Sequence, residues 1–251
     1  MRLLSRKMTM AKFNLAKILA IFFIILIPNS INSAEQIDPI KVNWSFKGLT
    51  GKFDRSALQR GFQVYKEVCA SCHSMQYLSY RNLGEPGGPE FSQEEVKAIA
   101  ASVEIEDGPD SQGEMFTRPG RPSDKFKSPY PNVNASIAAN GGAYPPDMSV
   151  LVKARPGGSN YIYSVLVGYE EPPSDINIED GVYYNKYMIG NKIKMSAPLS
   201  DGIVEYSDGT EATVDQMAKD VTTFLSWAAE PELEERHKTG VKVIIYLILL
   251  T

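Results

Sequence analysis

Two cysteines and a histidine form the group of residues with the clearest chemistry. Cys69, Cys72 and His73 spell C-x-x-C-H, in a chain that contains only two cysteines and two histidines. Thiols at this spacing can form thioether bonds to the two vinyl groups of one porphyrin, and the adjacent imidazole can then ligate the iron. The motif therefore predicts one covalently bound haem c, with His73 as the proximal ligand of its iron.

Two other kinds of site use the same residues. A thiol–disulfide redox site usually accompanies a βαβ pattern, whereas the sequence around Cys69 has helical periodicity. A structural zinc site needs four nitrogen or sulfur ligands, and the other histidine, His237, lies far along the chain beside an apolar tail. Both alternatives stay open, and the haem interpretation is favoured.

The second axial ligand of such a haem is expected to be a methionine, because His237 lies at the opposite end of the domain. Met75 follows His73 too closely to reach the opposite face of the haem, and Met217 belongs to a helical apolar stripe. The residues alone leave open the other methionines of the domain, which are Met115, Met148, Met188 and Met195.

The remaining pattern predicts a mainly α fold with long loops and minor β structure. Sixteen prolines and nineteen glycines, many of them clustered, favour ordered loops. Capping residues and apolar spacing predict helices at residues 54–69, 92–103, 134–140, 146–155, 159–169 and 213–230. Residues 106–132 are expected to form a loop, and residues 203–209 have hairpin character.

Both ends of the chain carry apolar segments. Residues 1–34 combine a basic start with a short apolar run, which predicts an export signal, with a retained amphipathic anchor as the alternative. Residues 239–251 end in an apolar stretch that covers about half of a bilayer core of roughly 30 Å. We interpret this stretch as the start of a truncated C-terminal transmembrane helix, or as a helix lying in the interface. Residues 35–238 are then one globular domain.

Several stretches together closely resemble the cytochrome c1 family, over about residues 40–250. They are Trp44-Ser45-Phe46-x-Gly48, Leu58 to Cys69, Cys72-His73-Ser74-Met75 with Tyr80-Arg81, Asn140-Gly141-Gly142-Ala143-x-Pro145-Pro146-Asp147-x-Ser149, and Asp208 to Glu232. The resemblance implies a c-type cytochrome fold. It also implies that Met195, in a loop that contains Pro198, is the second iron ligand, with Met188 as the alternative.

The resemblance also implies further haem contacts. Asn140, Tyr144, Pro145 and Pro146 resemble the haem-contacting loop of the family. Arg155 resembles an arginine near a haem propionate, where a guanidinium can donate paired charged hydrogen bonds. Tyr161 resembles an aromatic residue on the same wall, and the alternative is that Tyr161 and the two prolines serve packing only.

Members of this family transfer electrons, so the resemblance implies a role without catalytic side chains. The haem would accept an electron from the Rieske iron–sulfur protein and pass it to a soluble or tethered cytochrome c. The implied setting is a dimeric ubiquinol–cytochrome c reductase of a respiratory chain, which contains cytochrome b, with the haem domain on the periplasmic side of the cell inner membrane. A free-standing carrier and a haem peroxidase or gas sensor are the rival interpretations.

The charge of the chain argues against nucleic acid as a partner and is compatible with a basic protein partner. A formal net charge of −4 does not favour a nucleic-acid binder. Acidic residues cluster at 104–110, at 170–171 and at 175–180. These clusters are either ordinary solvated surface or a docking face that steers a basic cytochrome c.

Overall fold

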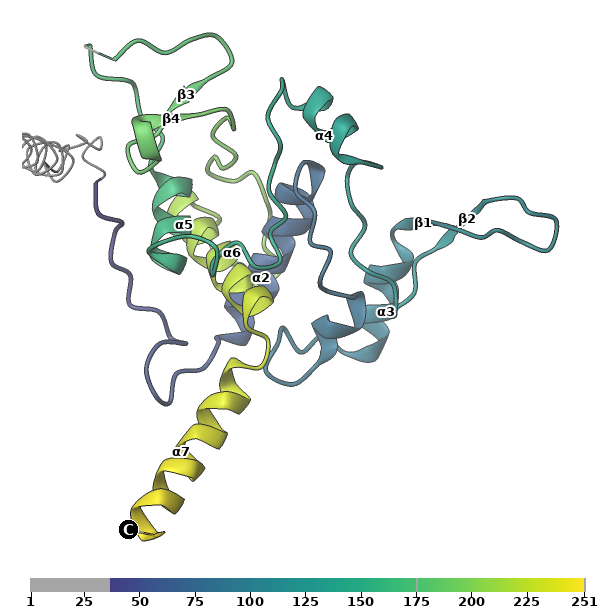
Figure 1. Ribbon diagram of the computed structural model, residues 1–251, viewed down its shortest axis with the longest axis vertical. Helices are drawn as coiled ribbons and strands as arrows, with labels where there is room; N and C mark the ends of the chain where they lie inside the picture. Colours follow the sequence, from purple (N-terminus) through teal and green to yellow (C-terminus); the bar gives the residue numbers. More distant parts are fainter. Residues whose placement is uncertain (1–36, 175, 251) are drawn as a thin grey trace, which may run out of the picture. The chain divides into compact units, whose positions relative to one another are not determined.

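The computed structural model describes residues 37–174 and 176–250, and this part of the chain is mainly helical with two small antiparallel sheets (Figure 1). This confirms the predicted class. The expected signal segment, residues 1–34, lies outside the described residues. In chain order the elements are α2 (Arg55–Glu67), η1 (Cys69–Ser71), η2 (Tyr80–Gly84), α3 (Gln93–Ala101), β1 (Glu104–Asp107), β2 (Phe116–Pro119), α4 (Val133–Ala139), α5 (Gly158–Val167), β3 (Tyr183–Tyr184), η3 (Ile189–Asn191), β4 (Lys192–Ile193), α6 (Val214–Ala229) and α7 (Leu233–Leu250).

Helix α2 leads directly into the C-x-x-C-H motif. It begins as predicted at Asp54, whose side chain accepts a hydrogen bond from the Ala57 N–H at 3.1 Å. Leu58, Phe62 and Tyr65 recur at helical spacing and are all buried. The buried face of α2 therefore fixes where the motif emerges from the core.

Helix α6 packs against α2 along this face, and the two helices lie side by side in Figure 1. A Cβ atom at Gly61 would collide with the backbone carbonyl of Asp220 and approach the Phe224 Cβ to 2.8 Å. The close approach of the two backbones thus depends on glycine at this position. The guanidinium of Arg60 reinforces the contact through two hydrogen bonds, of 2.9 and 3.0 Å, to the buried Asp220 carboxylate.

The capping signals located most helices correctly. Ser92 and Glu95 form the expected reciprocal capping box at the start of α3. The short helix α4 is followed by Gly141 and Gly142, whose φ angles of 58° and 83° favour glycine. Helix α6 ends at Ala229, two residues before Pro231, as the proline predicted.

Two local predictions were wrong. Residues 146–155 form turns instead of a helix, because backbone groups near the start of this segment bond to a distant segment, with Met148 N–H donating to the Ser74 carbonyl at 2.8 Å. Residues 203–209 form no strand. The sheets lie elsewhere: β1 begins just before the expected loop at 106–132 and pairs with β2 inside it, and β3 pairs with β4.

Helix α7 is joined to the start of α2 through a buried carboxylate. Arg55 donates to both oxygens of Glu234, at 2.7 and 3.0 Å, and the Phe53 N–H donates to Glu234 at 2.9 Å. One turn further on, the His237 Nδ1 lies 3.1 Å from the Gly51 carbonyl oxygen. These bonds connect the first turns of α7 to the helix that carries the motif.

The end of α7 is apolar, and its side chains from Val243 to Leu250 are exposed. Among the described helices, none combines the length and the apolar character that crossing a bilayer requires.

Replacing Glu234 with glutamine should lower the free energy of unfolding at neutral pH by about 1–3 kcal/mol, because Arg55 loses a charged partner that is almost fully buried. Burial alone would raise the pKa of Glu234, but the bonds from Arg55 and Phe53 outweigh it and lower this pKa. The stabilisation should therefore be complete above the unfolded-state pKa and disappear as the pH falls through the lower folded-state pKa.

Denaturant unfolding of the intact protein at pH 7 and in acid measures this effect. Glu235→Gln is the matched control, since Glu235 is exposed on the same helix and its ion pair among the described residues is with Lys238 at 3.6 Å. An equal loss of stability in both variants would contradict the assigned role of Glu234.

Candidate functional site

The three motif residues lie within one tight turn at the end of α2. The N–H groups of Cys72 and His73 both donate to the Cys69 carbonyl, at 3.1 and 2.9 Å. Cys69 is buried and Cys72 is half-buried, and the two thiols are not joined to each other. Two sulfurs and an imidazole are therefore held on one short, hydrogen-bonded segment.

The environment of the Cys69 thiol does not suit thiol–disulfide exchange. Burial, followed by the effect of Cys72, raises the pKa of the Cys69 thiol to about 12. Redox-active cysteines have lowered pKa values, since the thiolate is the reactive form. The zinc alternative also lacks support, because the described residues contain no cluster of three His, Cys, Asp or Glu side chains suited to a metal ion.

His73 is oriented by one backbone carbonyl. Its Nδ1 lies 2.8 Å from the carbonyl oxygen of Pro146, so Nδ1 carries the proton and donates it, and Nε2 keeps its lone pair. Burial lowers the pKa of His73, although the Pro146 bond and the nearby Asp147 charge act in the opposite direction. At neutral pH the buried ring is thus a neutral imidazole with Nε2 available to a metal.

The loop that supplies this carbonyl is tied to the motif by the carboxylate of Asp147. The Ser74 hydroxyl and the Gln76 N–H donate to one carboxylate oxygen, at 2.8 and 2.9 Å, and the Ser149 N–H donates to the other at 2.9 Å. The Ser149 hydroxyl in turn accepts from the Tyr77 N–H at 3.1 Å. Asp147 lies in one of the stretches that resemble the cytochrome c1 family, but its sequence context alone does not predict a role in the site.

The candidate ligand methionines differ in their burial and in which of their atoms accept hydrogen bonds. The sulfur of Met188 accepts a hydrogen bond from the Tyr161 hydroxyl at 3.2 Å. Met195 is half-buried, and the Tyr169 hydroxyl donates to its backbone carbonyl at 3.0 Å, which fixes the main chain. Met75 and Met217 are fully buried in the hydrophobic core, as expected for packing residues.

The other predicted contacts are distributed over the adjoining segments. Asn140 ends α4 and donates through its side chain to the Ser136 carbonyl at 2.7 Å, whereas Tyr144 is half exposed. Arg155 is exposed and donates to the Ala154 carbonyl at 3.1 Å. Burial raises the pKa of the buried Tyr161, and the charge of Arg155 lowers it in part.

Among the predicted site residues, His73 and Pro146 are joined directly by a hydrogen bond. The described hydrogen bonds do not connect Met195, Arg155 or Tyr161 to the motif. Pro145 is half-buried and precedes the carbonyl that contacts His73.

The acidic clusters differ in how far they are neutralised. Glu170 pairs with Lys186 at 3.1 Å, and Glu179 pairs with Lys192 at 2.9 Å. Asp175 lies outside the described residues. In the β1–β2 hairpin Asp110 caps the turn by accepting from the Gln112 and Glu114 N–H groups, while Glu104 and Glu106 are exposed.

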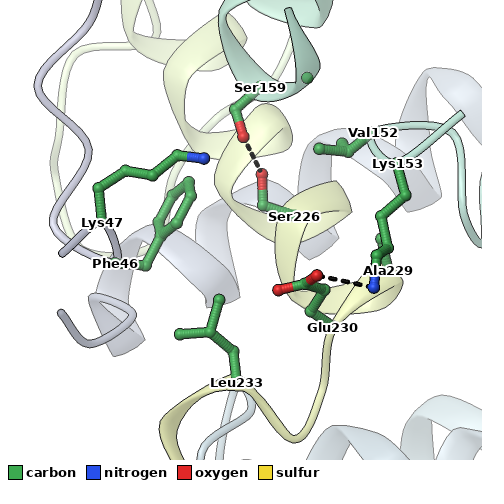
Figure 2. Close-up of a pocket in the computed structure, with 10 residues that line it drawn as sticks. Phe46, Lys47, Val152, Lys153, Ser159, Ser226, Ala229, Glu230 and Leu233 are labelled. Atoms are coloured by element: carbon green, nitrogen blue, oxygen red, sulfur yellow. Dashed lines mark hydrogen bonds and ion pairs between the residues drawn. The ribbon is translucent and has the colours of Figure 1, made fainter. Parts of the chain in front are cut away.

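A cavity of about 150 Å³ lies elsewhere, beside the end of α6 and the start of α5 (Figure 2). Figure 2 shows Ser159 hydrogen-bonded to Ser226 at 2.9 Å and Lys153 paired with Glu230 at 2.7 Å. None of the predicted site residues lines this cavity.

Comparisons with known proteins agree on one family. A family model described as the Cytochrome C1 family matches residues 44–251. Cytochrome b/c1 of Bradyrhizobium diazoefficiens is 52% identical over 225 residues, which cover 82% of this chain and 33% of that protein. The chain thus spans about a third of the length of this relative.

Two further relatives are similar over most of their own length. A protein of Solanum tuberosum named cytochrome c1-2, heme protein, mitochondrial, is 52% identical over 82% of this chain and 78% of its own length. Cytochrome c1 of Rhodospirillum rubrum is 48% identical over 84% of this chain and 82% of its own length.

Proposed function

The chain belongs to the cytochrome c1 family, and from that premise we propose that it transfers electrons through one haem as a subunit of a ubiquinol–cytochrome c reductase. Members of the family carry one covalently bound haem c with its iron. When bound, the haem supplies the one-electron redox couple, so the protein needs no acid, base or nucleophile of its own.

The donor set fits this cofactor. Cys69 and Cys72 supply the two sulfurs for thioether attachment, and His73 presents the Nε2 lone pair to the iron. The hydrogen bond from His73 Nδ1 to the Pro146 carbonyl, at 2.8 Å, is the single observation that carries the proposal, because it fixes the ring in the tautomer that a metal ligand requires.

Met195 is proposed as the second axial ligand. Met188 is the main alternative ligand, but its sulfur already accepts a hydrogen bond from the Tyr161 hydroxyl. The bond from the Tyr169 hydroxyl holds the backbone of Met195 in place. A His/Met pair raises the reduction potential of the haem, which suits a carrier that passes electrons to a cytochrome c in a respiratory chain. Asn140, Tyr144, Pro145, Arg155 and Tyr161 are proposed to line the haem pocket.

The proposed electron path runs from the Rieske iron–sulfur protein to a cytochrome c, within a dimeric complex that also contains cytochrome b. We assign residues 1–34 to export, residues 35–238 to the haem domain on the periplasmic side of the inner membrane, and residues 239–251 to membrane attachment. The exposed apolar side chains of Val243 to Leu250 support attachment. The exposed Glu104 and Glu106 of the β1–β2 hairpin, together with the exposed Glu171 and Asp180, are the proposed docking residues for a basic acceptor.

Purification from native membranes tests the proposal. The haem-stained chain should copurify with a cytochrome b and a Rieske protein, and the preparation should reduce cytochrome c when quinol is added. A haem protein recovered alone would support the free-standing carrier instead. Binding of carbon monoxide to the native reduced chain would indicate an open iron position and favour the peroxidase or gas sensor.

A further inference from the structure

The carboxylate of Asp147 is the most densely bonded charged group beside the motif. It accepts the Ser74 hydroxyl and the N–H groups of Gln76 and Ser149, all at 2.8–2.9 Å. Burial alone would raise the pKa of Asp147, but these donors outweigh it and lower this pKa, so the group is anionic at neutral pH. A half-buried anion with three donors is a fixed negative charge.

The bonds from Ser74 and Gln76 to Asp147 join two segments that are far apart in the sequence. On one side lies the stretch that follows His73, and on the other lies the loop that supplies the Pro146 carbonyl. Two more bonds run between the same segments, from the Met148 N–H to the Ser74 carbonyl at 2.8 Å and from the Tyr77 N–H to the Ser149 hydroxyl at 3.1 Å. Asp147 is next in sequence to Pro146, so fixing its carboxylate also fixes the carbonyl that orients His73.

We propose that Asp147 is a positioning residue for the proximal histidine and that it lowers the reduction potential of the haem. Its carboxylate holds the Pro146 carbonyl against His73 Nδ1, and its charge acts on the His73 ring. A hydrogen-bonded imidazole is the more electron-rich ligand, and a nearby negative charge favours the more positive, oxidised iron. Both effects lower the reduction potential of the haem. The inference rests on the proposed haem ligation by His73.

Redox titration of the haem in native membranes tests this role. In Asp147→Asn the ratio of reduced to oxidised haem at a fixed ambient potential should rise about tenfold, which is about 59 mV for a one-electron couple. Asp147→Glu keeps the negative charge, so its potential should lie much closer to that of the wild type. Asp54→Asn is the matched control, because it removes one negative charge at the far end of α2, and it should leave the potential unchanged.

A second variant tests the inference if the Asp147→Asn protein does not fold or retain haem. Ser74→Ala removes one donor and leaves the charge in place, so it should raise the same ratio about threefold. Wild-type potentials in every Asp147 and Ser74 variant that retains haem would overturn the inference while leaving the proposed function intact. A wild-type chain without haem would instead overturn the proposed function.

Discussion

Replacing Met195 with leucine should abolish the methionine–iron charge-transfer band of the oxidised haem and lower its reduction potential by at least about 0.1 V. This shift is a modest part of the roughly 0.8 V range over which axial ligands set haem potentials. Leucine fills a similar volume but offers no lone pair, so the iron loses a sulfur donor that favours its reduced state. Absorbance spectra and redox titration of the purified complex measure both changes.

Met188→Leu is the matched control for this substitution. It removes the sulfur that accepts the Tyr161 hydrogen bond and should leave the charge-transfer band in place. If the band instead persisted in Met195→Leu and vanished in Met188→Leu, the ligand role would belong to Met188, which was the alternative drawn from the sequence.

Replacing Gly61 with alanine should destabilise the protein by at least about 2 kcal/mol. The added methyl group would collide with the Asp220 carbonyl and the Phe224 Cβ, so α2 and α6 would have to separate. The gain in helix propensity from glycine to alanine, about 1 kcal/mol, offsets only part of this cost. Because α2 carries the C-x-x-C-H motif, the variant should also retain less haem. Denaturant unfolding and haem content per chain are the measurements.

The corresponding control is Gly240→Ala in α7, where an added Cβ would meet nothing within 4 Å. It should leave the stability unchanged or raise it slightly. A Gly61→Ala protein as stable as the wild type would show that the two helices do not require their close approach.

The features that the sequence predicted well are local ones. The Asp54 cap, the Ser92 capping box and the periodic apolar residues of α2 each involve neighbours within four positions, so their consequences are visible in the sequence. The motif itself is equally local, so Cys69, Cys72 and His73 could be proposed as haem-binding residues without a structure.

The features that were missed depend on contacts between distant segments. The expected helix at 146–155 is replaced by turns because Met148 and its neighbours bond to the segment after His73. The β1–β2 hairpin lies in a stretch rich in glycine and proline, and Arg118 secures it by pairing with both Asp107 and Asp124. Asp147 was overlooked for the same reason, since its partners Ser74 and Gln76 lie about 70 residues away.

The most direct measurement for the whole account is the mass of the proteolytic peptide that contains Cys69 and Cys72, taken from denatured protein purified from its native membrane. We expect this peptide to carry one haem, held through both sulfurs, and to absorb visible light. A colourless peptide with two free thiols would contradict it.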